Sequence, residues 1–150
     1  MRALVQRVAE GGVYIQKENY NAEIKKGMII LLGIKHDDNE NDVNFVADKC
    51  SNLRIFEDDN QKMNLSIKDI DGEVLVVSQF TLYADAQKGN RPSFTDAARP
   101  EIAIPLYEKF IERLKFNLGN DKIKSGIFGA MMQVKIINDG PVTISVESKK

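Results

Sequence analysis

The segment from Gly27 to Ile34 restricts the fold most, because an uninterrupted apolar run of this length is typical of a strand covered on both faces. It reads Met28-Ile29-Ile30-Leu31-Leu32 between a glycine and a polar stretch. A second run begins at Val74 and is β-branched and apolar as far as Val77, after which the chain turns polar. We therefore expect at least two buried strands with other elements on both sides of them.

Strand signals dominate the rest of the chain, in segments of alternating or β-branched residues bounded by turn residues. These segments are Arg2 to Glu10 and Val13 to Gln16 around a Gly11-Gly12 turn, Leu53 to Phe56, Ile67 to Leu75 with a hairpin signal at Asp71-Gly72, Val74 to Leu82, and Met131 to Asn138 and Val142 to Ser148 around Asp139-Gly140-Pro141.

Helical periodicity is found in two places. Val43, Val46, Ala47, Cys50 and Leu53 recur at spacings of three and four, which predicts an amphipathic helix capped by Asn39 or Asn41. Leu106, Phe110 and Leu114, with Tyr107 and Ile111, predict a second helix that ends near Gly119. Pro105 lacks a backbone donor, so this helix is expected to start near it or to kink at it. The pattern is strand-rich with two main helices.

Composition narrows the class of protein. A length of 150 residues suits one domain spanning residues 1–150, and 43% apolar with 29% charged residues excludes a disordered chain. Lysine plus arginine total 21 against 22 aspartate plus glutamate, so any nucleic-acid contact must be small and local. The chain shows no export signal and no apolar run long enough to cross a membrane. We expect a soluble cytoplasmic protein.

Thiol and metal chemistry find little support in the residues. Cys50 and His36 are the only residues of their types, which excludes an internal disulfide and a zinc site of cysteine and histidine ligands. Cys50 lies on the apolar face of the first helix and is expected in the core, while His36 is expected to be exposed. The cluster of Asp37, Asp38, Glu40 and Asp42 lacks the spacing of a calcium loop and is expected to be a solvated charge run. We expect no metal and no cofactor.

Polar residues at the end of the second buried strand are the best candidates for a site. Ser78, Gln79 and Thr81 must either bond to loop backbone or face a cavity, and both alternatives are open on the residues alone. Asn138-Asp139-Gly140-Pro141 is ordinary turn chemistry, and its residues alone favour a hairpin turn. A Gly-Pro bond can also be cis at small cost.

Two segments resemble the signature motifs of the D-aminoacyl-tRNA deacylases. These are Ser78-Gln79-Phe80-Thr81-Leu82-Tyr83-Ala84-Asp85 and Asn138-Asp139-Gly140-Pro141-Val142-Thr143. Similarity to that family continues in order along the chain at Leu4 to Val8, Asn52 to Asp58, Lys62 to Ser66, Arg91 to Ala98 and Gly126 to Ala130.

The resemblance implies a three-layer β/β/α fold and a homodimer. It implies an active site formed by Ser78, Gln79, Phe80 and Thr81 of one subunit, with Gly140 and Pro141 of the other subunit inserted into it through a cis bond. Arg7 and Met132 match family positions that help shape this pocket. The implied partner is the acceptor end of aminoacyl-tRNA.

The implied reaction is hydrolysis of the ester between a D-amino acid and tRNA, with L-aminoacyl-tRNA rejected and glycyl-tRNA accepted. An aminoacyl ester is already activated, so an oriented water and an oxyanion donor suffice, and the resemblance assigns that donor to the Phe80 amide. Two alternatives remain open: a general esterase that uses Thr81 or Ser78 as a covalent nucleophile, and a non-catalytic RNA-binding module.

Overall fold

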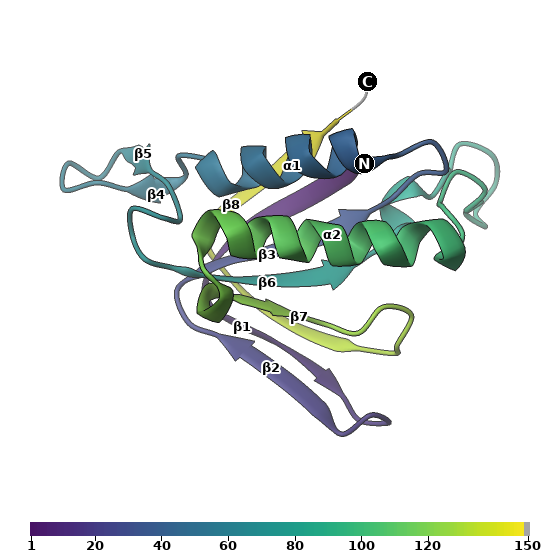
Figure 1. Ribbon diagram of the computed structural model, residues 1–150, viewed down its shortest axis with the longest axis horizontal. Coiled ribbons are helices and arrows are strands. Elements are labelled where there is room, and N and C mark those ends of the chain that lie inside the picture. Colours follow the sequence, from purple (N-terminus) through teal and green to yellow (C-terminus); the bar gives the residue numbers. More distant parts are fainter. Residues whose placement is uncertain (149–150) are drawn as a thin grey trace.

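The computed structural model describes residues 1–148 and contains one large sheet, a two-stranded ribbon and two long helices (Figure 1). The strands are β1 (Arg2–Ile15), β2 (Tyr20–Ile24), β3 (Gly27–Gly33), β4 (Phe56–Glu57), β5 (Met63–Leu65), β6 (Glu73–Ser78), β7 (Ile123–Ser125) and β8 (Gln133–Glu147). The α-helices are α1 (Glu40–Asn52) and α2 (Pro100–Leu118), and the 3-10 helices are η1 (Phe80–Tyr83) and η2 (Asn120–Lys122).

The large sheet has the order β2-β1-β3-β6-β7, and β8 also pairs with β1. The pairs β3 with β6 and β6 with β7 are parallel, and α1 and α2 provide the crossovers that parallel neighbours require. β3 and β6 approach closely where they begin. A Cβ on Gly27 would lie 1.8 Å from the carbonyl oxygen of Glu73, so only glycine fits there.

Two apolar clusters on opposite faces of β3 and β6 divide the molecule into three layers. Met28, Ile30 and Leu32 of β3 face α1 and α2, which lie side by side across this part of the sheet (Figure 1). Ile29 of β3 and Leu75 of β6 face the other way and pack against β2 and parts of β1 and β8. The expected three-layer β/β/α fold is confirmed, and both buried strands are covered on both faces.

The first strand corrects the expected Gly11-Gly12 turn. β1 runs through both glycines without interruption, and the hairpin turn lies further on, where the Asn19 N–H donates to the carbonyl oxygen of Gln16 (3.1 Å). Packing explains the glycine: a Cβ on Gly11 would lie 2.6 Å from Cδ1 of Ile29. This glycine serves a close contact between layers and not a turn.

The expected hairpin at Asp71-Gly72 is also wrong. The chain does turn there, with a φ of 53° at Asp71, but β6 then pairs in parallel with β3 and not with the strand before the turn. The expected strand from Leu53 to Phe56 is reduced to Phe56–Glu57, which pairs with β5.

The closing strands form one continuous strand, β8. Its two halves both pair with β1, from Arg2 opposite Glu147 to Tyr14 opposite Gln133, with register shifts on either side of Val8. The segment from Asn138 to Pro141 is therefore an irregularity inside a strand and not a hairpin turn. The Gly140-Pro141 bond is cis, as expected.

Both expected helices are present. The Asn39 side chain caps α1 by accepting from the Asn41 N–H (2.8 Å), and the Asp42 carboxylate accepts from the Asn39 N–H (2.8 Å). α2 begins at Pro100, so Pro105 lies inside the helix, where the Glu101 carbonyl loses its usual helical donor. The expected start near Pro105 is thus corrected.

The isolated chemical groups have structural roles. Cys50 is fully buried, as expected, and burial raises the pKa of its thiol to about 12. His36 is exposed, as expected, and its Nε2 lies 2.6 Å from the Thr95 carbonyl oxygen.

The acidic cluster is only partly solvated, which corrects the expected charge run. Asp38 and Asp42 are buried because they accept hydrogen bonds from main-chain groups, including the α-ammonium of Met1 at 2.6 Å from Asp38. Within residues 1–148, no group of three or more histidine, cysteine, aspartate or glutamate side chains is placed to hold a metal ion. In the same range, no helix is both long and apolar enough to cross a bilayer.

Candidate active site

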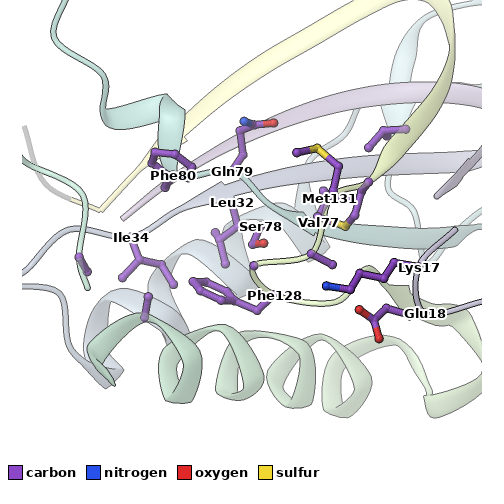
Figure 2. Close-up of a pocket in the computed structure, with 16 residues that line it drawn as sticks. Lys17, Glu18, Leu32, Ile34, Val77, Ser78, Gln79, Phe80, Phe128 and Met131 are labelled. Carbon is purple, nitrogen blue, oxygen red and sulfur yellow. The ribbon is translucent and has the colours of Figure 1, made fainter. Parts of the chain in front are cut away.

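A cavity of about 630 Å³ lies where β7 leaves the edge of β6 (Figure 2). β7 pairs with β6 only as far as Val76, and the chain then departs as the segment 126–132, called here the wall segment. Phe128 and Met132 of this segment line the cavity together with Val77 and Ser78 of β6. Divergence of two parallel strands thus opens a pocket of the size that binds small molecules.

Tyr107 of α2 fastens the point where the two strands diverge. Its buried hydroxyl lies 3.1 Å from the carbonyl oxygens of both Val76 and Gly126, and the Gly126 N–H donates to Val76 (2.9 Å). Burial raises the pKa of this hydroxyl. The Tyr107 ring also contacts the Phe128 ring edge-on, with centroids 5.7 Å apart. The Tyr107 side chain therefore contacts both Gly126, where the wall segment begins, and Phe128, one of its residues that line the cavity.

The signature residues Ser78 to Thr81 lie at the end of β6. The sequence predicted a strand that continues to Leu82, but β6 ends at Ser78. Ser78, Gln79 and Phe80 line the cavity. The Gln79 N–H donates to the carbonyl oxygen of Leu32 (2.8 Å), and its side-chain amide donates to the hydroxyl of Thr81. These bonds fix the direction in which the chain leaves the strand.

The N–H of Phe80 is the notable group at this edge. Phe80 begins the short helix η1, whose first N–H groups have no partner within the helix. No acceptor for the Phe80 N–H is found among residues 1–148. Phe80 is 54% exposed as a residue, and its ring contacts Phe94 edge-on, with centroids 5.2 Å apart. A main-chain donor is thus available at the cavity, and a ligand oxygen can accept from it.

Thr81 occupies a different position from its neighbours. It is exposed and does not line the cavity, and its hydroxyl accepts from Gln79. Among residues 1–148, the cavity lining contains no histidine, cysteine or aspartate, and its titratable residues are Lys17 and Glu18. The cavity lining therefore offers no histidine that could act as a general base toward a threonine nucleophile.

Gly140 lies in a second, smaller hollow of about 300 Å³ together with Arg7 and Glu57. The buried Arg7 guanidinium donates to the carbonyl oxygens of Asp139 (3.0 Å) and Ile55 (2.9 Å). Gly140 has a φ of 126°, and a Cβ there would lie 3.0 Å from Arg7 and 3.1 Å from the Val142 nitrogen. Arg7 therefore holds this loop in a shape that only glycine accommodates.

The two signature motifs do not meet within one chain. Ser78 shares a row of the sheet with Leu32 and Ala3, whereas Asn138 pairs with Val8, five positions further along β1. At ~3.3 Å per residue, Asn138 lies roughly 17 Å from that row along the strands, and Thr143 at the other end of its motif, which pairs with Gln6, lies roughly 10 Å from it. Met132 lines the first cavity, and Arg7 lies in the second hollow beside Gly140.

Some lining residues were not predicted as site residues. Phe128 lies in a segment that resembles the family, but its sequence gives no reason to place it in a pocket. Lys17 and Glu18 lie on the turn between β1 and β2, which reaches the cavity only because that hairpin folds over the sheet. No local signal identifies them, since their position depends on contacts between layers.

Comparison with known proteins identifies the family of this chain. The family model described as D-Tyr-tRNA(Tyr) deacylase matches residues 4–147. A D-aminoacyl-tRNA deacylase of Flavobacterium psychrophilum is 54% identical over 149 residues, covering 99% of this chain and 98% of the relative. One of Thermotoga petrophila is 53% identical over 150 residues, covering 100% and 99%.

Solved structures share the fold. The c-Myc DNA Unwinding Element Binding Protein superimposes with a TM-score of 0.93 at 41% identity, and 100% of both chains is covered. A probable eukaryotic D-amino acid tRNA deacylase shares the fold alone, with a TM-score of 0.85 at 15% identity over 97% of this chain and 98% of the other. By the extent of these matches, the chain belongs to the D-Tyr-tRNA(Tyr) deacylase family, a family of hydrolases.

Proposed function

We propose that this protein hydrolyses the ester that joins a D-amino acid to the terminal ribose of tRNA, and that it rejects L-aminoacyl-tRNA. The observation that carries the proposal is the free N–H of Phe80 at the edge of an apolar cavity, beside Ser78 and Gln79. The relatives named above are D-aminoacyl-tRNA deacylases, which is consistent with this substrate.

The chemistry needs few protein groups. Water adds to the ester carbonyl carbon, the bond from that carbon to the ribose oxygen breaks, and the ribose oxygen takes a proton. Negative charge develops on the carbonyl oxygen, and the Phe80 N–H is the donor assigned to it. Because the cavity lining lacks a histidine or aspartate base, the neighbouring ribose hydroxyl is assigned the role of orienting the water.

Discrimination between D- and L-aminoacyl-tRNA is assigned to the second motif, Asn138 to Thr143, which acts on the other subunit of a homodimer. Gly140 and Pro141 are exposed and lie outside the cavity of their own chain, so they can serve a deacylation site only in a second copy. Main-chain atoms of this loop would occupy the space that an L side chain needs. Discrimination by main chain is blind to the identity of the D side chain, and it also admits achiral glycyl-tRNA.

A covalent esterase that uses Thr81 is the rival enzyme, and one substitution separates the two. If the Thr81 hydroxyl only accepts a hydrogen bond from the Gln79 side-chain amide, Thr81→Val retains a measurable rate of hydrolysis, because substrate binding and the Phe80 N–H donor remain. A covalent nucleophile would lose essentially all turnover, and an acyl-enzyme would be trapped by hydroxylamine in the parent protein.

The proposal is tested by hydrolysis of D-tyrosyl-tRNA, L-tyrosyl-tRNA and glycyl-tRNA by the purified protein, with and without chelator. We expect rapid loss of the D and glycyl forms, persistence of the L form, and no effect of chelator. Equal loss of the D and L forms would support the general esterase. Binding of tRNA without loss of either form would support the RNA-binding module.

A further inference from the structure

The cavity beside Phe80 is apolar over most of its lining and carries charge at one end only. Its charged residues are Lys17 and Glu18, both on the turn between β1 and β2. Figure 2 shows these two side chains at one end and Ile34 and Phe80 at the other, with the Lys17 ammonium directed toward Phe128. The pocket therefore has a main-chain donor near one end and a cation at the opposite end.

Lys17 has no partner among residues 1–148. It makes no ion pair, hydrogen bond or ring contact there, whereas Lys109, Arg113 and Lys135 are all paired with carboxylates. An ammonium that is exposed and unpaired at the mouth of an apolar cavity is free to bind an anionic group of a ligand. Phosphate is the anionic group that nucleic acids present.

The proposed substrate fixes where such an anion would lie. This step rests on the function proposed above, in which the ester carbonyl binds at the Phe80 N–H. Figure 2 shows Phe128 between Phe80 and Lys17, so a terminal nucleoside extending along Phe128 would bring its 5′ phosphate toward the Lys17 end of the cavity. We propose that Lys17 binds the phosphate that joins the terminal nucleotide of the tRNA to the preceding one.

Glu18 allows the proposal to predict the sign of the effect of a substitution on substrate binding. It lies on the same turn and at the same end of the cavity, so it repels the phosphate that Lys17 attracts. Two neighbouring residues of opposite charge should therefore have opposite effects on substrate binding. A disturbance of the turn itself would move both effects in the same direction.

The experiment compares Lys17→Gln, Glu18→Gln and the control Lys25→Gln on two substrates. Lys25 lies on the turn before β3 and does not line the cavity. The substrates are D-tyrosyl-tRNA and D-tyrosyl-adenosine, which has the same ester and nucleoside but no phosphate. KM, kcat and the salt dependence of KM are measured for each variant.

For D-tyrosyl-tRNA, we expect Lys17→Gln to raise KM about three- to tenfold, Glu18→Gln to lower it, and Lys25→Gln to leave it unchanged. The kcat for D-tyrosyl-tRNA should not change in any variant. The parent protein and the three variants should hydrolyse D-tyrosyl-adenosine equally well. The slope of log KM against log salt should fall by about 0.7 in Lys17→Gln, as for one lost phosphate contact on a single strand.

Three results would overturn the proposal: KM shifts of the same sign at both positions, an equal loss on D-tyrosyl-adenosine, or no difference between Lys17→Gln and Lys25→Gln. A parent protein that hydrolyses neither substrate would instead refute the proposed function. The two failures are thus distinguishable.

Discussion

At the scale of the residue, the proposed chemistry depends on one main-chain hydrogen atom, the N–H of Phe80. Phe80→Pro deletes that donor, and proline is tolerated at the first position of a helix. Phe80→Ala is the matched control, because it removes the ring and keeps the N–H. We expect Phe80→Pro to lower kcat about 10²- to 10³-fold and Phe80→Ala to stay within about tenfold of the parent. Equal losses in single-turnover assays would assign the effect to the ring.

Sequence reasoning at this scale applied to Ser78, Gln79 and Thr81, polar residues at the end of a buried strand that need a hydrogen-bond partner or a cavity. Ser78 and Gln79 line the cavity, whereas Thr81 is exposed and its hydroxyl accepts from Gln79. Lys17 could not be predicted as a cavity residue from the sequence, because its position there depends on a hairpin that folds across the sheet.

At the scale of the element, Tyr107 connects α2 to the wall segment of the cavity. Tyr107→Phe deletes the hydroxyl that lies 3.1 Å from both Val76 and Gly126, so the wall segment should become more mobile and bind substrate less well. We expect KM for D-tyrosyl-tRNA to rise about two- to tenfold with little change in kcat. Amide hydrogen exchange in residues 126–132 should also become faster.

Tyr20→Phe provides the control for that prediction. Tyr20 donates a comparable hydrogen bond to the Ser125 carbonyl oxygen (2.7 Å), just before the wall segment begins. It should leave both KM and exchange in residues 126–132 unchanged. If the two variants behave alike, Tyr107 has no special role in shaping the cavity.

The contact between α1 and α2 makes a pH-dependent contribution to stability. Arg113 binds the Asp48 carboxylate with two 2.8 Å hydrogen bonds, and this bonding lowers the pKa of Asp48. A depressed pKa in the folded state means that the contribution is present above the unfolded pKa of about 3.9 and disappears as pH falls through the folded value.

Asp48→Asn should therefore lower the free energy of unfolding at pH 7 by about 0.5 to 1 kcal/mol, a modest value because the pair is partly exposed. Urea unfolding should show that the difference from the parent shrinks as the pH falls below the unfolded pKa of about 3.9. Glu112→Gln makes the same change in charge at an exposed position of α2 and should have no such effect. A deficit that is independent of pH would exclude the ion pair as its cause.

Elements were predicted correctly from the pattern of apolar residues and wrongly where the prediction relied on turn residues. Both helices follow from apolar residues spaced three and four apart, and both buried strands follow from continuous apolar runs. Gly11 was misread because glycine also permits close packing, here against Ile29 of the opposite layer. The Asp71-Gly72 turn is real, but only the parallel pairing with β3 determines where the following strand goes.

At the scale of the whole molecule, the separation of the two motifs predicts that activity requires two chains. Phe80→Pro and Gly140→Ala should each be inactive alone, the second because a Cβ conflicts with the positive φ and with the Val142 nitrogen. In a mixed dimer, one site would combine an intact Phe80 with an intact Gly140 from the other subunit. Refolding the two variants together at equal amounts should restore about a quarter of the parental activity.

Two controls keep that result interpretable. Sedimentation should show a dimer for the parent and for both variants. Each variant refolded alone at the same total concentration should stay inactive. Dimers of both kinds without any recovered activity would mean that both motifs serve the chain to which they belong.

The pairing of β1 with β8 has a consequence for biosynthesis. The ribosome delivers β1 first and β8 last, yet Arg2 pairs with Glu147 and Tyr14 with Gln133. One edge of β1 therefore stays unpaired until nearly all of the described chain has been made, and contacts so distant in sequence form slowly. The sheet of this enzyme can therefore be completed only once β8 has been made, and until then the growing chain exposes apolar strands on which a chaperone can act.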